Sequence, residues 1–234
     1  MKKIIFNDWC TTDDGIIIVS SPDYVINNSN FEEVKTGNRN GDYIINEDEY
    51  TNTELQFKLG ILSNSKDDFF QKLDNIVFNL NCNLKENKLT FEREDVYYPV
   101  KKIVFGKITN KFYLYGELDV KFICGPFRYA FENYIELINN SNLYYQGNVE
   151  GEPNIKIYGS GNIQLTINDE TVQINNVNEY VELDSKLLLC LNKDKTSKSR
   201  DMIGHFHLLS QGSNAISWVG NVSKVEILPR TAYK

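Results

Sequence analysis

The chain has 234 residues, a formal net charge of −7 and a pI near 5.0. The acidic balance argues against a nucleic-acid-binding protein, because such a protein needs a basic surface that displaces counterions from phosphates. A hydrophobic fraction of 41% argues against a disordered chain, and the 14 Tyr and 13 Phe residues favour strands.

The spacing of the cysteines and the length of the apolar runs indicate in which cellular compartment the protein folds. Cys10, Cys82, Cys124 and Cys190 are widely spaced and form no C-x-x-C pair. We therefore expect reduced thiols in a protein that is synthesised and folded in cytoplasm. No apolar run approaches the ~20 residues that span a bilayer, so we expect no membrane partner.

The first 53 residues predict two short strands and a long loop. Residues 3–6 and 15–20 are apolar runs, and the Asp13-Asp14-Gly15 step between them predicts a turn rather than a metal site, because adjacent carboxylates on an extended chain point in opposite directions. Residues 22–53 are polar and rich in Asn. Connections in compact domains are usually about 4–6 residues, so we interpret this long loop as a contact with another subunit.

The next segment predicts a strand followed by the clearest helix of the chain. Residues 53–61 alternate apolar and polar side chains, as a half-buried strand does. Ser65 is suited to cap a helix over residues 65–80, and Asp68 complements its dipole. Apolar side chains then recur from Phe69 to Leu80 at three- and four-residue spacing, which predicts a helix packed on the core.

A long hairpin over about residues 95–123 ends at Gly125-Pro126-Phe127, which we interpret as an interdomain elbow. Beyond it, short strands and turn signals alternate, as in an antiparallel β-sandwich. The expected strands cover residues 131–137, 154–158, 163–168, 171–174, 179–183, 187–191, 205–209, 215–219 and 222–228. The predicted fold is mostly β (all-β or α+β), with an N-terminal β-rich domain (1–124) that carries one α-helix and a C-terminal sandwich (125–234).

No motif for catalysis or cofactor binding appears, so we expect a protein that is not an enzyme and has no cofactor or metal. His205 and His207 would share one face of a strand, but no spacing points to further ligands. No G-x-S-x-G sequence supplies a nucleophile. Trp218, Tyr144 and Tyr145 are candidates for contact with a sugar or a partner, although a lone Trp in such a strand more often packs in the core.

The order of several short motifs carries a family resemblance. The motifs are Asp14-Gly15-Ile16-Ile17-Ile18, the strand and capped helix of residues 55–80, Phe122 with Gly125-Pro126-Phe127-Arg128-Tyr129, Gly147-Asn148, Glu152-Pro153-Asn154-Ile155-Lys156-Ile157, Tyr158-Gly159-Ser160-Gly161-Asn162-Ile163, residues 180–185, residues 212–218, Val225-Glu226-Ile227 and Pro229-Arg230. In this order the chain resembles the distal tail protein (Dit) family of long non-contractile-tailed bacteriophages. It departs from the family at His207, where proline is expected, and in residues 231–234, which lack an aromatic–basic ending.

The resemblance implies a hexameric ring whose C-terminal domain is a galectin-like sandwich. Such a ring continues the tail tube and is a structural hub of the tail tip or baseplate in the virion. Its partners would be further copies of itself, possibly as stacked rings, the major tail tube protein, a tail-associated lysin or tail fibre protein, and receptor-binding or baseplate proteins. DNA would pass through the channel without sequence-specific binding, which suits a negative chain. Within residues 22–53, Arg39, Asp42 and Tyr43 are the candidate ring interface.

Two alternatives stay open. The sandwich could be a carbohydrate-binding module for host cell-wall adsorption, acting through Trp218, Tyr144 or Tyr145. Within the hub class, the particle could instead be a contractile tail or a tailocin.

Overall fold

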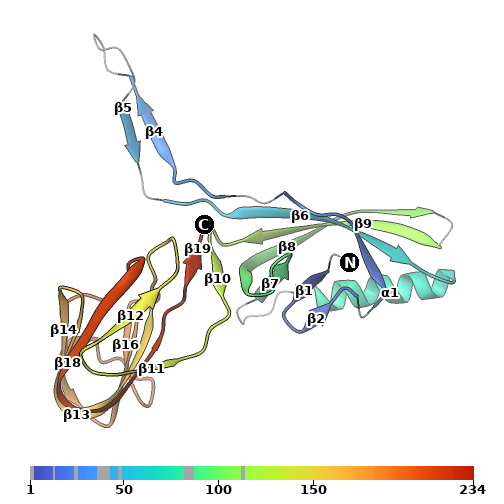
Figure 1. Cartoon of the computed structure of the whole chain (residues 1–234). Coiled ribbons are helices and arrows are strands. Elements are labelled where there is room, and N and C mark those ends of the chain that lie inside the picture. Colours follow the sequence, from blue (N-terminus) through green and yellow to red (C-terminus); the bar gives the residue numbers. More distant parts are fainter. Residues whose placement is uncertain are drawn as a thin grey trace. The chain divides into compact units, whose positions relative to one another are not determined.

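The structure is a computed structural model that describes residues 3–12, 14–23, 26–35, 43–46, 49–81, 87–111 and 114–234. The chain divides into two compact units, Met1–Tyr129 with Lys234, and Ala130–Tyr233 (Figure 1). Antiparallel strands dominate both units, and the described residues contain one α-helix. The mostly β fold class that the sequence predicts is therefore confirmed.

The first unit is built on one antiparallel sheet. Its strands are β1 (Ile4–Phe6), β2 (Trp9–Cys10), β3 (Ile16–Ser20), β6 (Thr53–Leu62), β7 (Asn87–Phe91), β8 (Val96–Lys111) and β9 (Tyr115–Cys124). They lie in the order β2-β1-β7-β8-β9-β6-β3, and β8 and β9 form the long hairpin. Leu55 pairs with Phe122 and Leu59 with Leu118, so the alternating apolar side chains of β6 and β9 gather on one face. That face forms the hydrophobic core of this unit.

Helix α1 (Lys66–Asn79) packs on this core. The Ser65 hydroxyl accepts a hydrogen bond from the Asp68 backbone N–H at 3.2 Å, which satisfies a donor that the first turn leaves open. Phe69 and Ile76 are buried, and both belong to the same cluster as the strand residues of β6 and β9. The predicted helix and its cap are confirmed.

A separate hairpin lies within residues 22–53, where the sequence predicts a loop. Strands β4 (Phe31–Val34) and β5 (Tyr43–Asn46) pair with each other in a two-stranded sheet of their own. The loop prediction is wrong for these eight positions. Each strand has only four residues, and Glu32-Glu33 interrupts the apolar alternation of β4, so neither gives a strand pattern.

The second unit is a β-sandwich. Its strands are β11 (Ile135–Leu137), β12 (Ser141–Tyr145), β13 (Asn154–Ile167), β14 (Glu170–Val177), β15 (Tyr180–Asp184), β16 (Leu189–Asn192), β17 (Met202–Ile203) and β18 (Gly212–Leu228). The short strands β10 (Arg128–Ala130) and β19 (Ala232–Tyr233) and the 3-10 turn η1 (Ser199–Asp201) complete the element order.

Two long strands, β13 and β18, pass from one layer of the sandwich to the other (Figure 1). The first half of β13 pairs with β15 and with the last half of β18, whose far edge carries β11. The second half of β13 pairs with β14 and with the first half of β18, beside β12. The change of layer in β18 falls near Gly220, whose φ of +122° is a conformation that L side chains rarely adopt.

Between the layers lies an apolar core of alternating β13, β14, β15 and β18 side chains, among them Ile155, Ile157, Val181 and Val225. Cys124 and Cys190 are buried free thiols, Cys10 is a half-buried one, and Cys82 lies outside the described residues. Across the described ranges, no helix is both long and apolar enough to span a membrane.

Candidate functional site

The outer face of β15, β13 and β18 carries a polar and aromatic surface. Because Ile155 and Ile157 point into the core, the alternate residues of β13 point outward. Tyr158 pairs with Tyr180 of β15 on one side and with Lys224 of β18 on the other. The register therefore brings together side chains that are far apart in the sequence.

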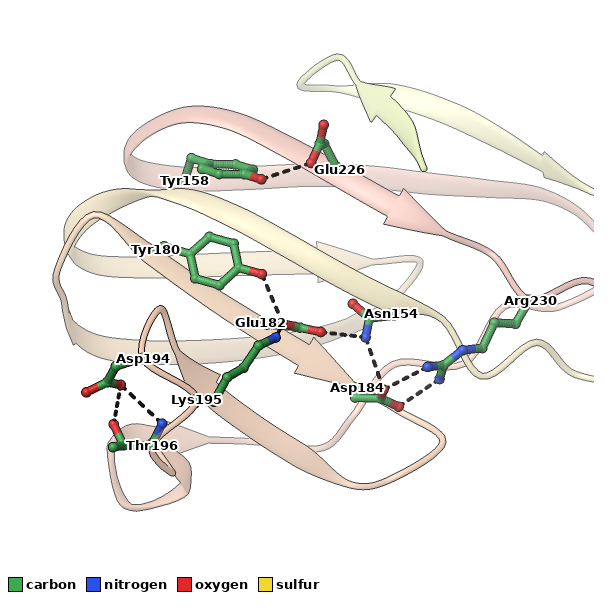
Figure 2. A network of polar contacts seen from close by, with 10 residues as sticks. All are labelled: Asn154, Tyr158, Tyr180, Glu182, Asp184, Asp194, Lys195, Thr196, Glu226 and Arg230. Atoms are coloured by element: carbon green, nitrogen blue, oxygen red, sulfur yellow. Dashed lines mark hydrogen bonds and ion pairs between the residues drawn. The ribbon is translucent and has the colours of Figure 1, made fainter. Parts of the chain in front are cut away.

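Tyr158 and Tyr180 form a fixed aromatic pair. Their ring centroids are 5.2 Å apart with the planes at 62°, an edge-on contact. The Tyr158 hydroxyl donates to Glu226 Oε2 and the Tyr180 hydroxyl donates to Glu182 Oε2, each at 3.0 Å (Figure 2). Burial and then the carboxylate hydrogen bond raise the pKa of both tyrosines, so both stay protonated donors at neutral pH.

A tight turn after β16 supplies two lysines. Asp194 Oδ1 accepts hydrogen bonds from the Thr196 backbone N–H and hydroxyl, which holds the turn closed. Lys195 Nζ bonds Glu182 Oε2, and this bond raises the pKa of the lysine. Lys193 Nζ bonds Glu179 Oε2 at 3.0 Å. Each ammonium group is thereby placed beside a carboxylate next to the tyrosine pair.

These groups border an open hollow of about 510 Å³. Its lining consists of Tyr158, Glu179, Tyr180, Lys193, Lys195 and Ser223. We call this hollow the tyrosine groove.

A buried polar network supports the groove from β15 (Figure 2). Asn154 Nδ2 donates to Glu182 Oε1 at 2.9 Å and to Asp184 Oδ2 at 3.0 Å. Arg230 binds Asp184 with two parallel bonds of 2.7 Å. Burial raises the pKa of the Asp184 carboxyl, but the bonds from Arg230, the Leu187 backbone N–H and Asn154 together outweigh it, and the net pKa is lowered. Glu182 is therefore held by Asn154, Tyr180 and Lys195 at once, which fixes the groove wall.

No protein-family model matches the sequence, and no curated protein matches it. The fold matches the crystal structure of the SPP1 Dit (gp 19.1) protein, with a TM-score of 0.77 and 11% sequence identity, over 97% of this chain and 98% of that one. That protein is described as a paradigm of the hub adsorption apparatus in phages that infect Gram-positive bacteria.

This chain has the fold of the SPP1 Dit protein. The resemblance to the distal tail protein family that the sequence indicates is confirmed at the level of the fold. The match extends over nearly the whole of both chains, although few residues are identical.

The three elbow residues belong to the first unit, and each is anchored there. The Gly125 backbone N–H donates to the Pro99 carbonyl at 2.8 Å. The Pro126 carbonyl accepts from Asn27 Nδ2, and the Phe127 ring makes an edge-on contact with Tyr50 at 4.8 Å between centroids.

The sugar-contact candidates of the sequence lie in different environments. Tyr145 is buried, and its hydroxyl donates to the Val149 carbonyl and accepts from the Ala232 N–H, so this ring is a core residue that no sugar can reach. Trp218 is half-buried and packs against the sandwich core. Tyr144 is 71% exposed on β12. None of the three lines the tyrosine groove.

The three candidate residues for the ring interface lie partly within and partly outside the described residues. Arg39 and Asp42 lie outside the described residues, and Tyr43 begins β5, where it pairs with Val34.

The strand predicted over residues 205–209 is wrong. Residues 205–208 carry no secondary structure, and Leu209 forms an isolated antiparallel bridge with Gly151, which lies outside the named strands. His205 is exposed and His207 is buried, so the two do not form a two-point site. In the described part of the chain, no group of three or more His, Cys, Asp or Glu side chains could hold a metal ion.

Sequence reasoning missed the tyrosine groove. A partial signal was present, because Tyr158 alternates along β13 with the buried Ile155 and Ile157, and Tyr180 begins β15, the next strand but one. The pairing of β13 with β15 decides that these two rings meet, and single-sequence periodicity does not give pairing.

Proposed function

We propose that this protein is the structural hub of a bacteriophage tail tip or baseplate. The observation that carries the proposal is the fold shared with SPP1 Dit over nearly the full length of both chains, since that protein is described as a hub of an adsorption apparatus. At 11% identity the match concerns the fold, so the function is our inference from it.

The proposed hub is a homohexameric ring that needs a heterologous interface between neighbouring copies. The β4–β5 hairpin is a candidate for it. A two-stranded hairpin is marginally stable in water unless it packs on something. This one exposes Phe31 (58%) and Ile45 (43%), and Ile26 just before it is 62% exposed. A second copy of the chain would cover these apolar side chains, and we keep Arg39, Asp42 and Tyr43 as further interface candidates.

In this proposal the ring joins the tail tube protein to a tail-associated lysin or fibre and to receptor-binding proteins in the virion. DNA would pass through the ring, and a chain with net charge −7 would repel it from the channel wall. The hub would hold these partners in place and would need no catalytic group.

The test is the solution mass of the purified protein by light scattering, with negative-stain images of the same fraction. We expect six times the 27.1 kDa chain mass, or twice that for two stacked rings, and a central channel in the images. Tail rings can need a template, so a monomer would be mixed with the tail tube protein. A chain that stays monomeric with that partner as well would contradict the proposal.

A further inference from the structure

We propose that the tyrosine groove is a binding site for a neutral saccharide. This site goes beyond the hub function and does not depend on it. It also assigns sugar recognition to residues other than Trp218, Tyr144 and Tyr145.

The size and the walls of the groove suit a small polar ligand. Its volume of about 510 Å³ lies within the ~300–1,000 Å³ that is typical of ligand sites. Tyrosine offers an apolar ring face together with a polar tip. A sugar ring has the same two aspects, with C–H groups on its faces and hydroxyls at its edge. Tyr158 and Tyr180 therefore supply surfaces on which a sugar ring can pack.

The polar groups of the groove are hydrogen-bonded to one another, and the most buried of them, Glu182, is held most firmly. Glu182 is only 10% exposed and bonds Asn154, Tyr180 and Lys195. Because each tyrosine hydroxyl donates its hydrogen to a carboxylate, its oxygen can act toward a ligand only as an acceptor. The Lys193 and Lys195 ammonium groups lie beside these acceptors as donors. Sugar hydroxyls both donate and accept, so they match a site that offers both, and fixed groups lower the entropy cost of binding.

The charge of the groove selects against polyanions. Lys193 is paired with Glu179, Lys195 with Glu182, and Lys224 with Glu226 at 2.7 Å. These three positive charges are thereby matched by negative ones, and the Lys156 ammonium, whose charge also acts on Tyr158, lies over the Tyr134 ring at 3.6 Å. A phosphate- or carboxylate-rich polymer would gain little net attraction from the three paired lysines. A neutral saccharide needs no net electrostatic attraction in order to bind.

The walls also differ from those of a protein-docking pocket. Protein interfaces place an aromatic or aliphatic anchor in a desolvated apolar pocket. Among the described residues, the groove is lined by two tyrosines, two lysines, one glutamate and one serine, and none of these is an aliphatic residue. The lining therefore favours a hydroxylated ligand over a peptide anchor.

The experiment screens the full-length protein against an array of neutral and acidic oligosaccharides, then measures the affinity of the strongest neutral ligand by titration calorimetry. Two variants alter the groove. Tyr180→Ala removes one ring, and Ser223→Trp fills the hollow from β18, where Ser223 is exposed. Tyr144→Ala is the matched control, because Tyr144 is exposed on β12 outside the groove. Circular dichroism and thermal melts check that each variant folds.

We expect saturable binding of a neutral oligosaccharide, weakened about tenfold or more by either groove variant and within about twofold of wild type in Tyr144→Ala. If Tyr180→Ala does not fold, Ser223→Trp alone decides the result. The proposal is overturned if no neutral oligosaccharide binds, if only acidic ones bind, or if the affinity survives the groove variants. Loss of binding in Tyr144→Ala alone would place the site elsewhere and would also overturn it.

Discussion

Buried polar residues of the sandwich differ in how well their side chains are hydrogen-bonded. Asp184 is buried but receives two bonds from Arg230 and one from Asn154. His207 is 2% exposed, and within the described residues no hydrogen bond of normal geometry reaches its ring nitrogens, although the Leu165 backbone lies close enough to act on the ring. A buried group with partners keeps its charge at little cost, whereas one without partners is best tolerated in its neutral form.

We expect His207 to make the stability of the protein depend on pH. Burial lowers the pKa of His207 below 6.5, and neither the Leu165 backbone nor the nearby Glu170 charge outweighs this. In the unfolded chain the histidine binds a proton near pH 6.5, so the unfolded state holds more protons below that pH and stability falls as the pH falls. The added slope is at most about 1.4 kcal/mol of unfolding free energy per pH unit.

The measurement is urea unfolding of wild type and His207→Leu between pH 5 and 8. The variant should lose the added slope below pH 6.5, while His205→Gln, at an exposed position, should keep it. Equal slopes in wild type and His207→Leu would show that His207 is not the cause.

At the scale of elements, the sequence predicted the structure that neighbouring residues determine, such as a capped helix. Helix α1 was predictable because its cap at Ser65 and its apolar spacing are contained in one short stretch. The β4–β5 hairpin was not predictable, because both strands are short and Glu32-Glu33 interrupts the apolar alternation of β4. The tyrosine groove was not either, because Tyr158 and Tyr180 meet only through the register of β13 and β15.

The packing of α1 on the sheet depends on a close approach at Gly116. A Cβ atom at this position of β9 would lie 2.7 Å from Phe69 Cζ and 3.0 Å from the Thr109 carbonyl oxygen. We expect Gly116→Ala to lower the unfolding free energy by about 1–3 kcal/mol, because Phe69 is buried and would have to leave its position.

A double-mutant cycle with Phe69→Leu separates this clash from other effects. The shorter side chain should relieve part of the Gly116→Ala penalty, so the double variant should be more stable than the sum of the two single losses. Denaturant unfolding gives all the free energies. Strictly additive losses would mean that the methyl group disturbs something other than the contact between helix and sheet.

At the scale of the whole molecule, the shared fold with SPP1 Dit persists at 11% identity. This is understandable because each unit needs only its pattern of apolar positions and a few special residues to fold. Surface residues that would contact partners are free to differ between such proteins. The fold was therefore predictable from the order of short motifs, whereas the partners were not.

The hub proposal predicts that the β4–β5 hairpin is needed for the ring and not for the fold of the chain. Phe31→Glu with Ile45→Glu places two charges on its exposed apolar positions, where a neighbouring copy would have to bury them. We expect light scattering to give a monomer, with the circular dichroism spectrum and melting temperature of the chain close to wild type. Deletion of residues 37–42 should have the same effect.

Ile138→Glu is the matched control, since Ile138 is 76% exposed in the second unit, and it should leave the ring intact. A ring that persists in both hairpin variants would exclude the hairpin as the interface. The hub proposal would then need another surface of the first unit to form the contact between copies.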